Sequence, residues 1–436
     1  MKPYAVISCP IDTYSGYGSR SRDFVKALYE LKKDEWEIAV LPQRWGATPW
    51  GYIEDNREEW GWLAPLLIQG GAMPKQPDYW YQITIPNEFQ AVAKLMNVGV
   101  TAGIETTVCD PTWIDGVNRM NVTYVSSKHA KTVFENSKFR EQNQQGQVAR
   151  EIVLQKPIEV LFEGADLAKY FYVADEDMEA TPLVDTLDAI KEDFCYLYVG
   201  HWTQGAVGED RKNVGGMLKV FFETFKDKKK RPALILKTSQ AGSSILDRDT
   251  VLERIEEVAK MVNSKDLPSV YLLHGEVEDK DMNDLYNHEK VKALISLTKG
   301  EGFGRPLLEF TLSKKPLITT NWSGHTDFLD PEMSVLLPGE LKQIHPTAVV
   351  QGILIQDSAW FSVNEDAAKK AMVEVYEKYN KFLDGAKRQS HKSRTEFSFD
   401  AMKELLGKLV ANYPKVEAIK LPQLKKIELP KLKKAD

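Results

Sequence analysis

The sequence predicts an α/β protein made of two doubly wound domains that face each other across a cleft. The chain has 436 residues, which is too long for one ordinary hydrophobic core. In its second half, short apolar segments alternate with amphipathic ones, a pattern typical of a parallel sheet covered by helices on both faces. A glycine-rich segment follows an apolar segment in each half, at the place where such sheets bind ligands.

The elements are clearest in the second half, where the expected strands are FCYLYVG, PALILKT, VYLLHG, VKALISL and PLITTN. Helical periodicity between them joins Leu218, Phe221, Phe222 and Phe225, and then Val251, Leu252, Ile255 and Val258. In the first half, strands are expected at 4–10, 36–42 and 122–127. Helices are expected around 24–31 and from about residue 128. The tryptophan-rich stretch 45–80 has weak periodicity and is expected to be irregular.

These patterns divide the chain at one acidic, poorly periodic segment, 174–193, which we interpret as the link between domains. The first domain is expected to span 1–175 and to be completed by a C-terminal helix over 397–413. The second is expected to span 183–395. The last segment, 414–436, contains the proline-spaced basic repeat LPQLKKIELPKLKKAD, which predicts a flexible tail or a surface strap rather than a regular helix.

Composition narrows the class of protein. Hydrophobic residues make up 43% and charged residues 28% of the chain, and a formal net charge of -6 argues against nucleic acid as the default partner. Cys9, Cys109 and Cys195 lie far apart in apolar surroundings, which favours buried thiols over disulfides or a metal site. The sequence shows no leader pattern and no apolar run that would span a bilayer. We therefore expect a soluble, cytoplasmic protein without an integral membrane segment.

The most distinctive stretch is TKGEGFGRPLLEF, from Thr298 to Phe310. Its three glycines, at 300, 302 and 304, allow backbone N–H groups to approach a ligand closely, and Pro306 suits the first turn of a helix. The positive end of that helix favours an anion. Arg211 and Lys212 follow one neighbouring strand, and Lys237 ends the next. The sequence therefore predicts a site for a diphosphate.

Two nucleotide-binding alternatives fit less well. Gly16 and Gly18 in SGYGSRS form only a partial dinucleotide fingerprint, and the following strand ends without an acidic residue for a ribose. The sequence also has no G-x-x-x-x-G-K-[ST] motif of the NTPases. The acidic run at 175–177 suggests a solvated surface rather than a metal-bound nucleotide.

Taken together, these motifs resemble the retaining, GT-B-fold nucleotide-sugar glycosyltransferases (glycosyl transferases group 1, family 4-like). The matching stretches are, in chain order, SGYGSRSRDFVKAL, VTYVSSKHAKTVF, VLFEGADLAKYF, RKNVGGMLKVFFETF, and TKGEGFGRPLLEF followed by KKPLITTNWSGHTDFL. The last is the most specific, because it holds two glutamates with seven residues between them. The resemblance extends to about Val410 and implies two Rossmann-like domains.

The resemblance also implies roles on the donor side. Glu309 would hold the ribose hydroxyls, and Glu301 would lie beside the transferred sugar. The backbone of Gly302, Phe303 and Gly304 would contact sugar and phosphate. Carboxylates accept hydrogen bonds from hydroxyl groups well, so both placements are chemically sensible.

This sequence departs from the family at two places. Many members carry arginine where His201 stands, so the charge that acts on the phosphate would come from Lys212, with Arg211 or Lys237 as helpers. Many members also have a first-domain histidine near the sugar. The matching segments of this sequence contain other side chains at that place. The candidates on the acceptor side are Asn87, Glu88 and Glu105. We interpret His129 as a helix-surface residue.

The resemblance implies transfer of a sugar from a nucleoside-diphosphate sugar to an acceptor hydroxyl, with retention of configuration and with neither metal nor cofactor. The acceptor would be a glycan, a lipid-linked sugar or a small molecule. One alternative is a hydroxyl-bearing modified DNA base, contacted by Lys425, Lys426, Lys433 and Lys434 and by the aromatic first domain. Others are a nucleotide-sugar epimerase or hydrolase, and a non-catalytic protein that binds sugar nucleotides.

Overall fold

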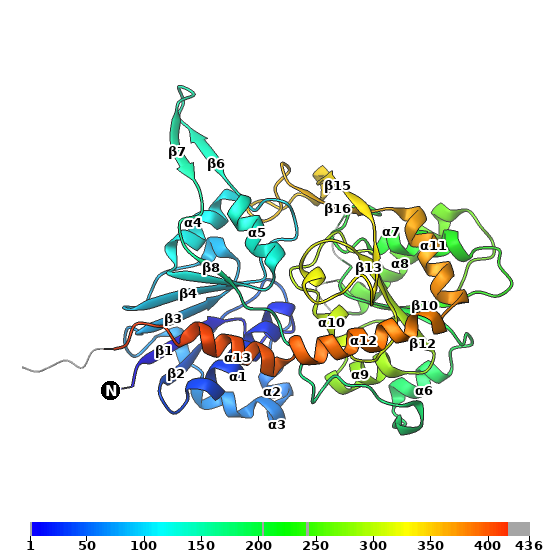
Figure 1. The fold of residues 1–436 in the computed structure, drawn as a ribbon, viewed down its shortest axis with the longest axis horizontal. Coiled ribbons are helices and arrows are strands. Elements are labelled where there is room, and N and C mark those ends of the chain that lie inside the picture. Colours follow the sequence, from blue (N-terminus) through cyan, green and yellow to red (C-terminus); the bar gives the residue numbers. More distant parts are fainter. Residues whose placement is uncertain (1, 203–204, 241–243, 417–436) are drawn as a thin grey trace, which may run out of the picture.

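The structure is a computed structural model that describes residues 2–202, 205–240 and 244–416 of the chain. Two α/β domains lie side by side, and each contains a six-stranded parallel sheet (Figure 1). In the first domain the strand order is β2-β1-β3-β4-β5-β8. These strands are β1 (Tyr4–Cys9), β2 (Glu37–Pro42), β3 (Tyr79–Ile83), β4 (Met96–Thr101), β5 (Val122–Val125) and β8 (Ile158–Val160).

In the second domain the strand order is β11-β10-β9-β12-β13-β14. The strands are β9 (Cys195–Val199), β10 (Ala233–Lys237), β11 (Val270–Leu273), β12 (Val291–Ser296), β13 (Leu317–Thr320) and β14 (Val335–Leu337). The chain direction across the sheet reverses between β9 and β12, which is the switch point where doubly wound sheets bind ligands. The expected fold class, two doubly wound α/β domains, is confirmed.

Helices cover both sheets, as the apolar periodicity predicted. The main ones are α1 (Gly16–Lys32), α4 (Pro111–Arg119), α5 (Lys128–Asn136), α7 (Val214–Phe225), α8 (Ile245–Val262), α9 (Asp279–Asn287), α10 (Arg305–Thr311) and α11 (Glu365–Glu377). Helix α1 begins directly after the β1 loop, because the Ser15 side chain accepts a hydrogen bond from the Gly18 N–H. Its apolar face, including Phe24 and Leu28, is fully buried in the first core.

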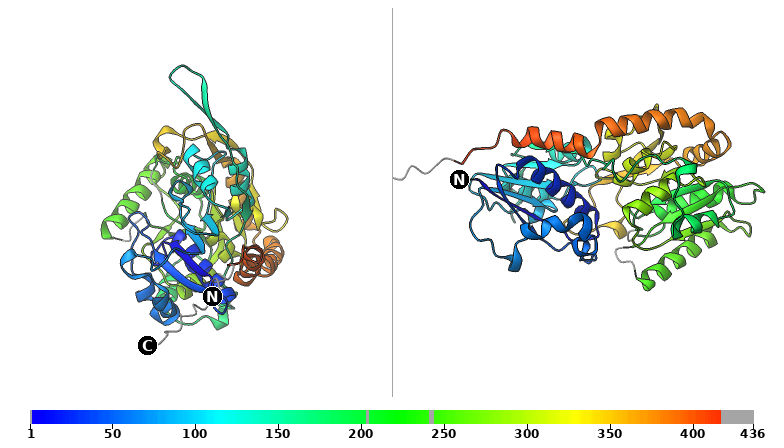
Figure 2. Two further views of the ribbon diagram at one scale, coloured as in Figure 1. Left: turned by 90° about the vertical axis from the view of Figure 1, so that its left-hand side faces the viewer. Right: turned by 90° about the horizontal axis from the view of Figure 1, so that it is seen from below.

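The C-terminal helices run along one side of both domains (Figure 1; Figure 2). Helix α12 (Asn380–Glu396) packs on α10, and α13 (Phe399–Val410) packs on α1 of the first domain. Met402 and Leu406 of α13 are fully buried in the first core. The Phe399 N–H donates to the Ala165 carbonyl at 2.7 Å, so the return crossing lies beside the outward one. The four tail lysines lie outside the described residues.

Three local features were missed from the sequence. Strands β3 and β4 were not predicted, because β3 ends the tryptophan-rich stretch and β4 contains Asn97 and Gly99, which weaken its apolar pattern. The stretch 45–80 contains the short helices α2 (Tyr52–Asp55) and α3 (Arg57–Trp60). The segment 174–193 also holds α6 (Pro182–Asp188), and Leu187 of this helix is buried in a core of the second domain.

Two hairpins stand apart from the sheets. The hairpin β6 (Phe139–Gln142) and β7 (Val148–Ile152) projects away from the first domain (Figure 1). The hairpin β15 (Gly339–Gln343) and β16 (Ala359–Val363) extends the second domain toward the first. There the Thr107 N–H donates to the Ala359 carbonyl at 2.9 Å, and Trp113 Nε1 donates to the Gly352 carbonyl at 2.8 Å. The two domains are therefore joined on this side as well.

The three cysteines are free and buried, as expected. Among the described residues, no helix combines the length and the apolar character needed to cross a membrane.

Candidate active site

The candidate catalytic residues meet at the boundary between the domains. Glu301 follows β12, and Arg211 and Lys212 follow β9, the two strands that flank the switch point of the second sheet. Glu105 follows β4 of the first sheet. All four side chains thus come from the carboxyl ends of parallel strands, where ligand sites of such sheets form.

Their side chains form a compact ion cluster. Lys212 Nζ lies 2.7 and 2.6 Å from the two carboxylate oxygens of Glu301. Arg211 Nη1 lies 2.9 Å from Glu105 Oε1 and 3.8 Å from Glu301 Oε2. Burial acts to raise the pKa of Glu301, but the charges of Lys212 and Arg211 outweigh it and lower that pKa. Glu301 is therefore ionised although it is only 7% exposed.

The glycine-rich loop packs directly on the first domain. A Cβ atom on Gly300 would lie 2.6 Å from the Glu105 carbonyl oxygen, and one on Gly302 would lie 3.0 Å from the Ala102 carbonyl oxygen. The Ser126 hydroxyl of the first domain donates to the Gly302 carbonyl at 3.0 Å. In this arrangement the two glycines are needed for the close approach of the domains.

The rest of the motif lies within the second domain. Gly304 precedes α10 with a φ of 94°, a left-handed conformation that favours glycine. The Phe303 side chain is buried against Phe328 in the second core, so only its backbone remains for a ligand.

Glu309 lies one turn into α10 and is 6% exposed. Arg305 Nε donates to Glu309 Oε1 at 2.8 Å, and the Tyr286 hydroxyl lies 3.5 Å from Glu309 Oε2. Burial raises the pKa of Glu309 to about 7, although Arg305 acts in the opposite direction and Asp279 adds to the rise. This carboxyl group consequently titrates near neutral pH.

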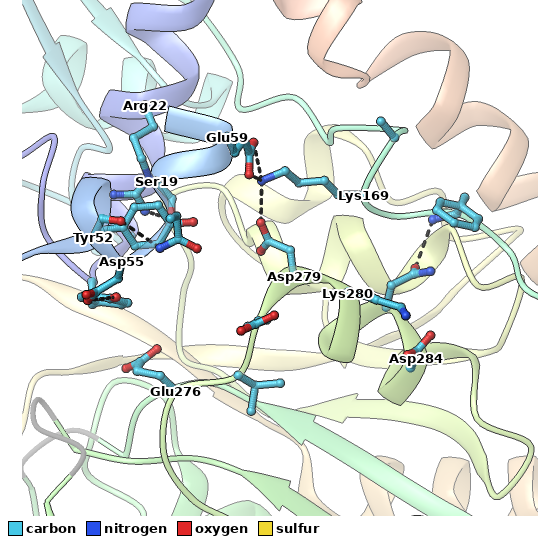
Figure 3. Close-up of a pocket in the computed structure, with 18 of the residues that line it drawn as sticks. Ser19, Arg22, Tyr52, Asp55, Glu59, Lys169, Glu276, Asp279, Lys280 and Asp284 are labelled. Carbon is cyan, nitrogen blue, oxygen red and sulfur yellow. Dashed lines mark hydrogen bonds and ion pairs between the residues drawn. The ribbon is translucent and has the colours of Figure 1, made fainter. Parts of the chain in front are cut away.

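A cavity of about 1050 Å³ lies between the domains (Figure 3). The first domain contributes Gly16, Ser19 and Arg22 of α1 and Tyr52 and Asp55 of α2. The second contributes residues of the β9 and β11 loops and of α9. Acidic side chains dominate the lining: the eight carboxylates are Asp55, Glu59, Asp177, Glu179, Glu276, Glu278, Asp279 and Asp284, and the cations are Arg22, Lys169 and Lys280.

One ion bridge crosses the edge of this cavity. Lys169 Nζ lies 2.8 Å from Glu59 and 2.7 Å from Asp279, and these residues project toward one another in Figure 3. The Tyr170 hydroxyl donates to Asp279 at 2.8 Å, and the Tyr170 ring contacts the ring of Tyr286. The two tyrosines thus connect Asp279 on the cavity wall with Glu309 behind it.

Of the other predicted donor residues, two line the cavity and two do not. Gly16 and His201 line it, and His201 Nδ1 lies 3.3 Å from the Ser239 hydroxyl. Desolvation and then the charge of Lys212 lower the pKa of His201. Lys237 Nζ donates to the Gly275 carbonyl at 2.7 Å. Gly18 is not among the cavity residues and packs against the preceding loop, since a Cβ atom there would lie 2.2 Å from the Thr13 carbonyl oxygen.

The structure separates the three acceptor-side candidates. Glu105 lies in the ion cluster, whereas Asn87 and Glu88 line a different cavity of about 490 Å³ beside Arg119. Arg119 Nη2 donates to the Asn87 carbonyl at 2.8 Å, and Glu88 accepts a hydrogen bond from the Thr84 hydroxyl. Asn87 and Glu88 do not share the site of Glu301.

Sequence reasoning missed several residues at the boundary. The interpretation of His129 as a helix-surface residue was wrong, because its ring packs edge-on against Trp322 of the second domain at 4.9 Å. Burial lowers the pKa of His129 to about 4. Arg305 was also missed, although its position four residues before Glu309 on one helix was a readable signal. Its other partner, Asp23, is on α1, and no spacing in the sequence connects the two.

Comparison with known proteins places this geometry in a fold class. No protein-family model matches the chain, and no curated protein sequence matches it either. Many solved structures do match over nearly the whole chain. The two parallel-sheet domains and the cleft between them define the GT-B fold, which these structures share.

Three of these structures illustrate the likeness. Sucrose-phosphate synthase from Thermosynechococcus elongatus is 13% identical, with a TM-score of 0.59 over 94% of this chain and 98% of that one. HepE from Anabaena, in complex with UDP and glucose, is 12% identical, with a TM-score of 0.61 over 94% and 99%. A UDP-forming α,α-trehalose-phosphate synthase from Burkholderia xenovorans, in complex with glucose-6-phosphate, is 9% identical, with a TM-score of 0.58 over 93% and 99%.

Proposed function

We propose that this protein is a retaining glycosyltransferase that moves a sugar from a nucleoside-diphosphate sugar to an acceptor hydroxyl without a metal ion. The observation that carries the proposal is the convergence of Arg211, Lys212, Glu301 and Glu105 at the carboxyl ends of strands from both sheets. The fold shared with HepE, whose structure holds UDP and glucose, supports a nucleotide-sugar donor.

In the proposed reaction, the bond between the anomeric carbon and the diphosphate breaks, and the acceptor oxygen bonds to the same face of that carbon. The leaving phosphate oxygen takes the acceptor proton. Lys212 and Arg211 stabilise the negative charge that grows on the phosphate, a role that needs fixed cations in a site shielded from water. For this, both cations exchange a carboxylate partner for the phosphate, since Lys212 now pairs with Glu301 and Arg211 with Glu105.

The two carboxylates, Glu301 and Glu105, then have a second role. Glu301 and Glu105, once released from the cations, are acceptors for sugar hydroxyl groups of donor and acceptor. We propose that Glu301 binds the transferred sugar and that Glu105 faces the acceptor. Glu309 binds the ribose, and the cavity lined by His201 and Val277 receives the nucleoside.

The charge of the cleft favours one class of acceptor. Arg211 and Lys212 can meet the charge of the donor diphosphate, but eight carboxylates and three cations line the cavity, so the many further phosphates of a DNA polyanion would be repelled at its entrance. We therefore propose a neutral, hydroxyl-rich acceptor, a glycan or a small molecule, over a modified DNA base. The tail lysines of the DNA alternative lie outside the described residues.

The proposal is tested with a panel of UDP-, GDP- and ADP-sugars. Binding is scored by thermal shift, because a ligand stabilises the native state it binds. Turnover is then followed as nucleoside diphosphate released with pooled glycan and small-molecule acceptors, and the anomeric configuration of the product is read by NMR. Glu301→Gln is the control, since it keeps the shape of the side chain and removes its charge. Donor consumption without an acceptor would favour a hydrolase or an epimerase, and binding without turnover a non-catalytic protein.

A further inference from the structure

A chain of three charged side chains joins the first domain to the nucleotide side of the second. Arg305 and Glu309 stand on α10, and Asp23 stands on α1 of the first domain. Arg305 Nε donates to Glu309 Oε1 at 2.8 Å, while Nη1 of the same guanidinium pairs with Asp23. All three side chains are largely shielded from solvent, with 21%, 8% and 12% of the Arg305, Glu309 and Asp23 side chains exposed.

We propose that Asp23 is a positioning residue for nucleotide binding. By holding one arm of the Arg305 guanidinium, it keeps one oxygen of Glu309 open for the ribose hydroxyls, so that ribose binding depends on contact between the two domains. This inference rests on the proposed function, in which Glu309 binds the ribose.

The geometry of the guanidinium group supports this role. Arginine presents five N–H donors in a planar fork, and two of them can cover both oxygens of one carboxylate. Here the fork is divided, with Nη1 on Asp23 and only Nε on Glu309 Oε1. Without Asp23, Arg305 is free to bind both oxygens of Glu309, which would remove the acceptor from the ribose.

The second oxygen of Glu309 has acceptor capacity to spare. The Tyr286 hydroxyl donates to it from 3.5 Å, at the outer limit of a hydrogen bond. A carboxylate oxygen has two lone pairs, and a ribose presents two neighbouring hydroxyl groups as donors. An oxygen so weakly engaged can accept a ribose hydroxyl without breaking a strong bond.

The location of Asp23 couples this contact to the cavity. Asp23 lies two turns along α1 from Gly16, which lines the cavity, and one residue from Arg22, which also lines it. Arg20, on the same helix, fixes α1 by donating to the Phe162 carbonyl at 2.9 Å. A movement of α1 with the first domain would therefore move Asp23 away from Arg305 and change how Arg305 binds Glu309.

The experiment measures ribose recognition separately from nucleotide affinity. Calorimetry gives the Kd of the tightest binder among UDP, GDP and ADP, and the Kd of its 2′,3′-dideoxy form; their ratio is the ribose discrimination. The full-length variants are Asp23→Asn, Arg305→Lys and Glu309→Gln, with Glu30→Gln as the control. Glu30 is also on α1, but it pairs with Lys403 of α13, away from α10.

We expect the ribose discrimination of Glu30→Gln to equal that of the wild type, and the ribose discrimination of Asp23→Asn to be roughly tenfold lower. Arg305→Lys keeps the charge but cannot hold two carboxylates in fixed directions, so it should lose a similar factor even if Asp23→Asn does not fold. Unchanged discrimination in a folded Asp23→Asn or in Arg305→Lys, beside a loss in Glu309→Gln, would overturn the inference and leave the proposed function intact. Unchanged discrimination in Glu309→Gln would instead overturn the ribose assignment, and the inference with it.

Discussion

Replacement of Lys212 by methionine is the sharpest test of the ion cluster. Lys212 lies in a loop, and a loop lysine is ordinarily expected to affect activity more than stability. In the structure, however, its side chain is only 15% exposed and holds both oxygens of Glu301, whose side chain is 9% exposed. Lys212→Met should therefore reduce both transfer activity and stability.

The size of the stability loss follows from burial. Removing one partner of a buried ion pair costs about 3–5 kcal/mol, because the remaining charge stays desolvated without its partner. Arg211 remains 3.8 Å from Glu301 Oε2 and offsets part of this loss, so we expect a value at the lower end, about 3 kcal/mol. At about 2–4 °C per kcal/mol, the melting temperature of the second domain should fall by about 6–12 °C.

Scanning calorimetry and a transfer assay check this together. In the double variant Lys212→Met/Glu301→Gln no carboxylate is left without a partner, so most of the melting temperature should return while activity stays lost. The control is Lys219→Met on α7, where the pair with Glu223 spans 3.8 Å and is partly exposed, so that little change is expected. A melting temperature of Lys212→Met within about 1 °C of wild type would refute the reasoning, since one partner of a buried ion pair cannot be removed without cost while the other stays charged.

Four further outcomes are expected. Burial raises the pKa of Glu309 to about 7, so nucleoside diphosphate affinity should rise between about pH 6 and 8 as the carboxylate forms, and calorimetry should find this slope absent in Glu309→Gln. The same raised pKa means that the stability contributed by this group is present below its ordinary pKa of 4.5 and is lost as pH rises through about 7. Gly302→Ala places a methyl group 3.0 Å from the Ala102 carbonyl oxygen and should lower turnover through the domain contact, with normal activity arguing against that contact. Asn87→Ala and Glu88→Gln should leave kcat/KM nearly unchanged, because both residues lie in the separate cavity.

The second sheet could be predicted because its strands are buried on both faces. Such strands are nearly continuous apolar runs, and all five that were expected appear as β9 to β13. Strand β14 (Val335–Leu337) has only three residues and was not recognised. In the first sheet, β4 contains Asn97, whose side chain accepts hydrogen bonds from the Val92 and Ala93 N–H groups. This polar residue interrupts the apolar pattern of the strand because it satisfies backbone groups of the preceding turn.

In the candidate site, too, some contacts could be predicted from the sequence and others could not. Residues at the ends of neighbouring strands in one sheet, such as Lys212 and Glu301, could be brought together from the sequence, because parallel strands align their carboxyl ends. Pairs across the domain boundary could not be, as Glu105 with Arg211 and Asp23 with Arg305 show. Their meeting depends on how two folded surfaces fit, and that fit leaves no periodic signal in the chain.

The ion cluster explains why carboxylates stand beside a site that the sequence predicts for an anion. Arg211 and Lys212 are both buried enough that an unpaired charge would be costly, and each has a carboxylate partner in Glu105 and Glu301. A diphosphate offers the same two cations more negative charge and more acceptor oxygens than the carboxylates do. The exchange would release both carboxylates at the moment when sugar hydroxyls need acceptors. Because Glu105 belongs to the first domain and Arg211 to the second, the same exchange would also loosen one contact between the domains, which links donor binding to their relative movement.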